Sequence, residues 1–361
     1  MKWKIFIAAV SFVAGVNNMQ AAGNFFPANH PFIQYFGRWN MSDTGHAQYS
    51  WPGVYLRTEF TGTSIRIRMT DSTNYFNVSI DGNVHHVFHG TQRGETEYVL
   101  AENLPNANHT LVFSRRNITF ESPYSLGGFV LDSGATLLPP PPKPLRKIEF
   151  IGDSFTAAES NEATEPSLPW EARFPVTNID KGFAVIIAKH FQAQYTTTCR
   201  SGSGMYCNWQ GDTNIAIPKI FDRTLMEQKY PQWNFQQWIP DVVVICLGLN
   251  DFSGLKDSSG IVSHEKSLNF KTAYRRFVHK LRDVYPRTNI VAVAAYPEWI
   301  RFHVKQIVDE EIASGHHDIF YATFDEIPGG YVANGHPTVA THQKMADQII
   351  QAMESFNLFI K

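Results

Sequence analysis

Cysteine is scarce in this chain: only Cys199, Cys207 and Cys246 occur among its 361 residues. At most one pair can form, and one thiol must stay free. Cys246 lies in an apolar run and is expected to be buried. Cys199 and Cys207 can bridge only if the intervening loop folds back. No Cys/His spacing resembles a zinc site, so the sequence predicts no metal centre.

Lys/Arg clusters and long apolar runs are missing as well. The formal net charge is −2, and no basic patch offers an electrostatic footprint for nucleic acid or an anionic membrane. Beyond the N-terminus no segment has ~20 consecutive apolar residues, so no second membrane anchor is expected. Aromatic residues make up 14% of the chain. Most are expected to fill a β-rich core, and some can line a sugar-binding surface.

The N-terminus has the pattern of a signal peptide. Lys2 and Lys4 supply positive charge, and residues 5–16 form an apolar run that is too short to span a bilayer. Ala21 and Ala22 offer a small-residue cleavage site. We therefore expect a signal peptide over residues 1–22, and a protein that is secreted and extracellular, or periplasmic if the source is a Gram-negative bacterium.

Four Asn-x-Ser/Thr sequons begin at Asn40, Asn77, Asn108 and Asn117. In a eukaryotic secretory pathway they would be glycan sites on exposed loops or strands. In a bacterium they would have no such meaning, and the sequence leaves both readings open.

A proline-rich segment divides the chain into two parts. Residues 138–145 read Leu-Pro-Pro-Pro-Pro-Lys-Pro-Leu, and such a run is stiff and cannot continue a helix or a central strand. We therefore expect an N-terminal domain over residues 23–137, a linker over 138–145 and a second domain over 146–361.

The first part has the pattern of an all-β domain. Alternating or β-rich runs occupy residues 64–69, 75–80, 84–88, 109–113 and 127–131. Asp81-Gly82 is a strong hairpin turn signal between two of them. Convincing amphipathic helices are absent from this part. Short strands at such spacing predict a sandwich of the jelly-roll kind.

The second part alternates strands and helices. Strands are expected at residues 148–151, 195–199, 241–247, 289–295 and 319–322, and helices at 182–193, 271–284, 303–313 and 338–356. The continuous apolar run 241–247 is typical of a strand covered on both faces. The pattern predicts a parallel α/β sheet of the flavodoxin-like, three-layer type, with functional groups at the carboxyl ends of its strands.

Ser154 directly follows the first of these strands, behind Gly152 and Asp153. A Ser at this turn places its hydroxyl at the sheet edge, and its own N–H can point at a bound carbonyl oxygen. The same pattern also fits a helix cap after a strand. By itself it therefore leaves catalysis and capping open.

Three further loops at strand ends carry polar groups in a suggestive order. Residues 200–205 form a glycine loop whose N–H groups can donate to an oxyanion, Asn250 closes the apolar strand, and His336 precedes the last helix. Each alone also fits a structural role: a flexible turn, a loop Asn bonded to its own backbone, or a helix-entry His. The order Ser, Gly, Asn, His on successive strand ends is much more specific.

At this point the sequence resembles the SGNH (GDSL-type) hydrolase superfamily. Gly152–Ser154, Gly248–Asp251 and His336-Pro337 match its motif blocks. The resemblance narrows to carbohydrate esterase family 2, which joins a jelly-roll sandwich to an SGNH domain, because runs such as Trp51–Val54 and Gly127–Ala135 are similar to that family's N-terminal domain.

The resemblance implies removal of acetyl groups from polysaccharides of the acetylxylan or glucomannan type. It assigns Ser154 as nucleophile and His336 as its base. The oxyanion hole is then formed by the N–H of Ser154, by Gly202 rather than Gly204, and by the Asn250 side chain. The implied mechanism is a two-step acyl transfer that needs no cofactor, and the expected partner is an acetylated polysaccharide or oligosaccharide bound by a monomer.

Some positions depart from the family pattern. Many SGNH enzymes place an Asp two or three residues before the catalytic His, where this chain has Asn334 and Ala333. Asn334 can orient the imidazole but brings no negative charge, so we hypothesise a Ser–His dyad. Residues 157–160, Ala-Ala-Glu-Ser, replace a stretch rich in glycine and aromatics. Trp209 and Trp299 are candidates for a sugar platform, or for core positions.

Two rival functions remain at this level. One is a GDSL-type lipase or thioesterase for other acyl esters. The other is a carbohydrate-binding protein with a degenerate catalytic domain, which the N-terminal sandwich and the missing acidic residue at Asn334 would fit.

Overall fold

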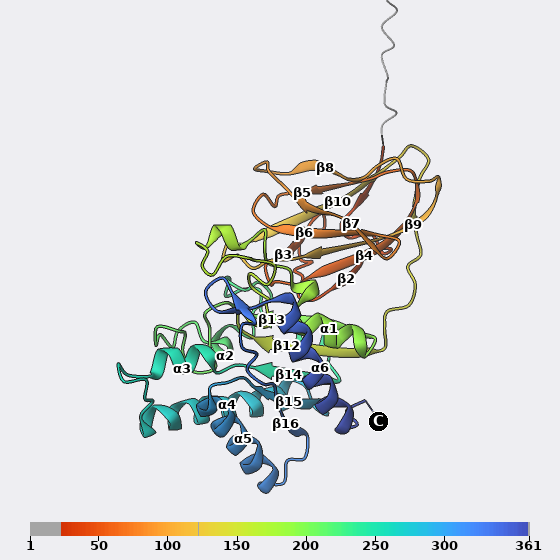
Figure 1. Cartoon of the computed structure of the whole chain (residues 1–361). Coiled ribbons are helices and arrows are strands. Elements are labelled where there is room, and N and C mark those ends of the chain that lie inside the picture. Colours follow the sequence, from red (N-terminus) through yellow and green to blue (C-terminus); the bar gives the residue numbers. More distant parts are fainter. Residues whose placement is uncertain (1–22, 122, 360–361) are drawn as a thin grey trace, which may run out of the picture.

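The computed structural model describes residues 23–121 and 123–359. The expected signal peptide at residues 1–22 lies outside the described residues. The chain forms an all-β part followed by an α/β part, which are the upper and lower halves of Figure 1. The predicted fold class, a β-sandwich followed by an SGNH-like parallel α/β domain, is confirmed. Within the described residues no helix is both long and apolar enough to cross a membrane.

The sandwich consists of two antiparallel sheets, with strand orders β1-β10-β5-β8 and β11-β4-β9-β6-β7. The short strands β3 and β2 pair with β10 and β4. The strands are β1 (Asn24–Pro27), β2 (Gln34–Phe36), β3 (Ala47–Tyr49), β4 (Tyr55–Gly62), β5 (Ile65–Met69), β6 (Tyr75–Ile80), β7 (Asn83–His89), β8 (Thr96–Ala101), β9 (Ala107–Arg115), β10 (Tyr124–Leu131) and β11 (Leu137–Leu138). Burial alternates strictly along β4 and β5. Each sheet therefore turns one apolar face to the shared core.

The α/β part has a five-stranded parallel sheet in the order β13-β12-β14-β15-β16. Its strands are β12 (Arg146–Gly152), β13 (Ala193–Cys199), β14 (Val242–Cys246), β15 (Asn289–Ala294) and β16 (Ile319–Thr323). The first strand, β12, thus lies between the second and the third. Such a reversal of strand order opens a crevice at the carboxyl ends, where open α/β sheets bind ligands.

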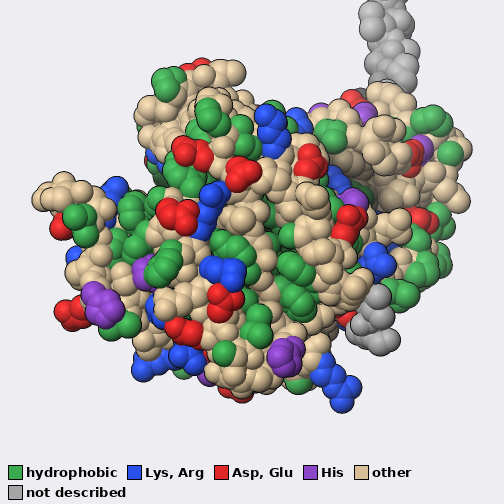
Figure 2. All heavy atoms as spheres, turned by 60° about the horizontal axis from the view of Figure 1, so that its bottom comes forward, with side chains coloured by type: hydrophobic (Ala, Val, Ile, Leu, Met, Phe, Trp, Pro, Cys, Tyr) green, Lys and Arg blue, Asp and Glu red, His purple; other side chains and the backbone are tan. Residues whose placement is uncertain are grey.

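Helices cover both faces of this sheet, with α1 and α6 on one side and α4 and α5 on the other (Figure 1). The helices are α1 (Phe183–His190), α2 (Ile217–Ile220), α3 (Leu249–Leu255), α4 (His264–Val284), α5 (Glu298–Ala313) and α6 (Val339–Ser355), with 3-10 turns η1 (Glu171–Arg173), η2 (Ile179–Lys181) and η3 (Phe235–Gln237) and a two-stranded ribbon of β17 (Tyr331–Val332) and β18 (His336–Pro337). Acidic and basic side chains are interspersed on the face that Figure 2 shows.

Two helices begin earlier than the hydrophobic pattern predicts. Helix α4 starts at His264, because the Ser263 hydroxyl accepts a hydrogen bond from the N–H of Lys266 and caps the first turn. Helix α5 starts at Glu298, directly after Pro297. The three cysteines are all buried and free, so the possible Cys199–Cys207 bridge does not form.

A buried ion pair joins the two parts of the molecule. The guanidinium of Arg38, in the sandwich part, lies 2.9 Å from the carboxylate of Glu149 on β12, and neither side chain is exposed. Arg38 also donates to the carbonyls of Phe221 and Arg223. Buried charges are tolerated only when they are paired and hydrogen-bonded, so this pair is one of the contacts that hold the sandwich on the sheet.

Removing one partner of this pair should destabilise the whole chain. We expect Arg38→Met to lower the free energy of unfolding by about 3–5 kcal/mol, because Glu149 is left as an unpaired buried charge. Urea denaturation followed by circular dichroism measures the loss. The double variant Arg38→Met/Glu149→Gln should recover much of it.

A matched control is the exposed pair of Lys305 and Asp309 on α5, whose side chains are about half exposed. There Lys305→Met should change the stability by no more than about 0.5 kcal/mol. An equal loss in the two single variants would contradict the importance of the buried pair.

Candidate active site

The four predicted loops meet at the carboxyl edge of the parallel sheet. Ser154 follows β12, Gly202 lies in the loop after β13, and Asn250 lies in the first turn of α3, after β14. His336 lies on β18, immediately before α6. Because β12 lies between β13 and β14, the first three loops are neighbours in space as well as in motif order.

The turn around Ser154 is held by local hydrogen bonds. The N–H of Phe155 donates to the Asp153 carboxylate at 3.0 Å, and the N–H of Glu159 donates to the carbonyl of Ser154 at 3.0 Å. A Cβ at Gly152 would overlap Thr156 and lie 2.9 Å from the carbonyl oxygen of Cys246, so only glycine fits there. Gly152 therefore allows the end of β12 to lie close to the end of β14.

Asn250 is positioned by the loops on either side. Its amide Nδ2 donates to Asp153 Oδ2 at 3.0 Å and to the carbonyl of Ser203 at 3.1 Å. Burial raises the pKa of Asp153 to about 7, and the nearby Asp251 carboxylate adds to the rise. One amide thus ties the nucleophile loop, the glycine loop and the start of α3 together.

Asp251 has a structural role that the sequence analysis missed. Its buried carboxylate accepts the N–H groups of Met205, Tyr206 and Cys207 at 2.6–3.0 Å. Burial raises its pKa to about 6, while these backbone hydrogen bonds oppose the rise. The consecutive residues Asn250 and Asp251 in the motif are the sequence signal for this role. Asn250 faces the site, and Asp251 fixes the glycine loop that completes the site.

The two glycines of this loop have different surroundings. A Cβ at Gly204 would overlap the Asp251 carboxylate, so this glycine is needed for packing. Gly202 has a φ of +77° and lies beneath Trp209, whose Cδ1 would be 3.1 Å from a Cβ at residue 202. Among residues 23–121 and 123–359, the structure records no partner for the N–H of Ser154 or Gly202. Both are available to a ligand oxygen.

His336 is oriented by a backbone carbonyl. Its Nδ1 lies 2.8 Å from the carbonyl oxygen of Ala333. A carbonyl can only accept, so Nδ1 carries the proton and Nε2 is left as the basic nitrogen. Ala333, Asn334 and Gly335 all have positive φ, and this tight turn aims the Ala333 carbonyl back at the imidazole.

Asn334, the side chain considered as an orienter of His336, does not have this role. The Asn334 side chain points away: its Oδ1 accepts from the N–H of Leu168 at 3.0 Å, and its Nδ2 donates to the Ser167 hydroxyl at 3.1 Å. The positive-φ turn directs the side chain toward this neighbouring segment and the carbonyl of Ala333 toward the histidine.

The two tryptophans considered for the sugar platform have different surroundings. Trp209 is 56% exposed and covers Gly202, so its indole face is available at the site. Trp299 donates to the Ser267 hydroxyl at 3.1 Å and packs on Phe252 and Phe270. Trp299 is therefore a packing residue, which corrects its candidacy as a sugar platform.

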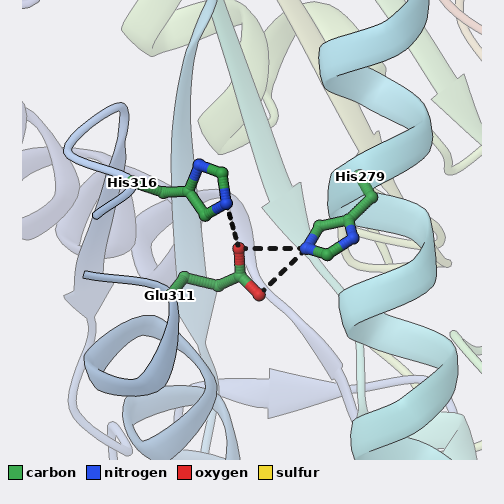
Figure 3. Close-up of side chains that lie close together, drawn as sticks. All are labelled: His279, Glu311 and His316. Carbon is green, nitrogen blue, oxygen red and sulfur yellow. Dashed lines mark hydrogen bonds and ion pairs between the residues drawn. The ribbon is translucent and has the colours of Figure 1, made fainter. Parts of the chain in front are cut away.

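A cluster of His279, Glu311 and His316 has the residue types of a metal site (Figure 3). The Glu311 carboxylate, however, also accepts from Arg282 at 2.6 Å and from Arg275 at 3.1 Å. Burial opposes ionisation of Glu311, but these hydrogen bonds and that of His279 hold its pKa below the usual value. Its negative charge is already compensated. The cluster is an ion-pair network that joins α4 to α5 at their C-terminal ends, at the sheet edge opposite Ser154.

The geometry at His336 gives a direct test of the dyad hypothesis. Asn334→Ala should change kcat for a small acetyl ester by less than about threefold, because the Ala333 carbonyl keeps the imidazole in place. The measurement is the initial rate of hydrolysis of 4-nitrophenyl acetate. A loss as large as that of Ser154→Ala would contradict a histidine that needs no side-chain partner.

Comparison with known proteins agrees with this arrangement. Residues 35–141 match the family model described as Carbohydrate esterase 2 N-terminal. The chain is 30% identical to "Cellulase/esterase CelE" of Acetivibrio thermocellus. The match covers 89% of this chain but only 39% of the length of that relative. It is 27% identical to an "Acetylxylan esterase / glucomannan deacetylase" of Cellvibrio japonicus, over 94% of this chain and 93% of the relative.

A solved structure is similar over both domains. It is the family two carbohydrate esterase from Clostridium thermocellum in complex with cellohexaose, with a TM-score of 0.81 and 27% identity over 90% of this chain and 98% of that one. The N-terminal family match and the likeness along both domains agree with the Ser, Gly, Asn and His loops at one sheet edge. Residues 35–141 therefore carry the N-terminal domain of carbohydrate esterase family 2, and the chain is similar over both domains to a family two carbohydrate esterase.

Proposed function

We propose that this protein is a carbohydrate O-acetyl esterase with Ser154 as nucleophile and His336 as general base. The observation that carries the proposal is the hydrogen bond from Nδ1 of His336 to the Ala333 carbonyl, which leaves Nε2 basic at the edge that also presents Ser154. The relatives named acetylxylan esterase and glucomannan deacetylase support the same activity.

The proposed reaction has two acyl-transfer steps. Ser154 Oγ attacks the acetyl carbonyl carbon while His336 Nε2 accepts the hydroxyl proton. The N–H groups of Ser154 and Gly202 stabilise the oxyanion, and the Asn250 amide joins them by turning one N–H from the Ser203 carbonyl toward the oxyanion. Removing one such donor typically costs roughly 3 kcal/mol. The sugar oxygen leaves with the proton from His336. Water, deprotonated by the same nitrogen, then releases acetate from the serine.

The proposed substrate is an acetylated polysaccharide or oligosaccharide of the acetylxylan or glucomannan type. The exposed indole of Trp209 beside Gly202 offers a flat apolar face on which a sugar ring can stack. A similar family two structure was obtained with cellohexaose, which is consistent with a glycan site in this fold. We further propose that the protein is secreted and acts as a monomer.

Loss of the nucleophile tests the function itself. Ser154→Ala should lower acetate release from acetylated xylan by at least about 10³-fold, because only oxyanion and binding contributions remain. Acetate is measured enzymatically, and the wild type should also hydrolyse 4-nitrophenyl acetate much faster than the butyrate.

Two outcomes would overturn the proposal. Xylan binding without acetate release in the wild type would indicate a carbohydrate-binding protein with a degenerate site. Equal or faster hydrolysis of the butyrate would indicate a lipase or thioesterase.

Trp209 gives a separate test of the glycan platform. We expect Trp209→Ala to raise KM for acetylated xylo-oligosaccharides by about two- to tenfold, since an aromatic contact is worth about 0.5–1.5 kcal/mol. The kcat for 4-nitrophenyl acetate should stay within about twofold. Trp209→Phe, which keeps an aromatic face, is the matched control. An equal loss on the small ester would show that the indole supports the loop rather than the glycan.

A further inference from the structure

We propose that Glu159 is a positioning residue whose carboxylate stabilises the protonated form of His336 during catalysis. It thereby supplies the negative charge that this chain lacks in the segment before the histidine. The inference rests on the proposed function, because it assigns a role within the same proton transfer.

The geometry places a buried carboxylate beside the basic nitrogen. Glu159 Oε1 lies 3.8 Å from His336 Nε2, and the two side chains are only 2% and 12% exposed. The same Oε1 accepts from Arg173 at 2.7 Å, and the Nε of Arg173 donates to the carbonyl of Leu168 at 3.0 Å. Glu159 is therefore held at one fixed distance from the imidazole, too far for a hydrogen bond that would block Nε2.

The backbone around Glu159 is committed to this position. Ala158 and Ser160 have φ values of 52° and 57°, a conformation that non-glycine residues rarely adopt. The turn is fixed by hydrogen bonds from Glu159 N–H to the Ser154 carbonyl and from Ser160 N–H to the Thr177 hydroxyl. A strained backbone directly after the nucleophile is a feature that functional sites often retain.

The charge of Glu159 acts differently before and after proton transfer. In the resting state Nδ1 carries the proton, so the carboxylate faces the lone pair of Nε2, which is unfavourable. Once Nε2 has taken the proton from Ser154 Oγ, the carboxylate faces an imidazolium, which is favourable in this buried setting. Only an interaction that strengthens toward the transition state accelerates the step. Glu159 exchanges no proton and forms no new bond.

Other charged groups face this pair from the surrounding elements. Asp153 is buried and interacts electrostatically with Glu159. His342 on α6 is fully buried, and burial together with His336 lowers its pKa to about 3, so it stays neutral. Arg173 is the cation paired with Glu159, at the end of η1. Any pH effect on the pair includes these charged or titratable neighbours.

The test is the pH dependence of kcat/KM for 4-nitrophenyl acetate. In Glu159→Gln the imidazolium loses its counter-charge, so the acid limb of the kcat/KM profile should move to lower pH. The kcat should fall about 10- to 100-fold, and KM should stay within about twofold. In Arg173→Met the carboxylate loses its partner, so the acid limb should move to higher pH. Opposite shifts from two variants of one ion pair are not expected from a structural role.

Glu162 offers a matched control on the same loop. It pairs with Arg116 and with Lys181 at 2.7 Å, and within the described part of the chain the structure records no ion pair or hydrogen bond between it and His336. Glu162→Gln should lower the melting temperature while leaving the acid limb and kcat unchanged. If Glu159→Gln fails to fold, Arg173→Met alone decides the proposal.

An acid limb that stays in place in both Glu159→Gln and Arg173→Met would overturn the role of Glu159. The proposed function fails separately, if Ser154→Ala retains full activity on the same ester.

Discussion

The arrangement of the site depends on the hydrogen bond between the Asn250 amide and the Asp153 carboxylate. This bond forms because β12 lies between β13 and β14, so that the loops after all three strands share one edge of the sheet. Asn250 also reaches the carbonyl of Ser203 and so fixes the glycine loop. The nucleophile and its donors are thereby preorganised before any substrate binds.

Three buried carboxylates lie at the site, and each has a different task. Asp153 holds Asn250, Asp251 holds the backbone of the glycine loop, and Glu159 faces His336. Burial disfavours the ionised forms of Asp153 and Asp251, whose pKa values are raised to about 7 and about 6. The Glu159 carboxylate forms an ion pair with Arg173. The site thus combines carboxylates that stabilise structure with one that can act on the base.

The N-terminal sandwich is joined to the catalytic part by buried polar contacts. Arg38 pairs with Glu149 on β12, and Arg116 pairs with Glu162 in the loop that follows the nucleophile. Tyr55 stacks on Tyr195 of β13 at 4.7 Å between ring centroids. Because the contacts end on β12, β13 and the nucleophile loop, the sandwich supports the elements that carry the site.

The sequence alone determined the two-part architecture and the four loops, because hydrophobic periodicity and the order of short motifs are local properties. Ser154, Gly202, Asn250 and His336 could be named from these loops. Local patterns were less successful at helix ends, where the Ser263 cap starts α4 seven residues before the predicted helix at 271–284.

Only the tertiary structure decided which groups meet across loops. The orienter of His336 is the carbonyl of Ala333 rather than the side chain of Asn334, since three successive positive-φ residues set that turn. Trp299 is partly buried against the core while Trp209 stays exposed, because burial depends on distant partners. Glu159 faces His336 although 177 residues separate them in the chain. Such a contact arises from the way the sheet folds, and no local pattern encodes it.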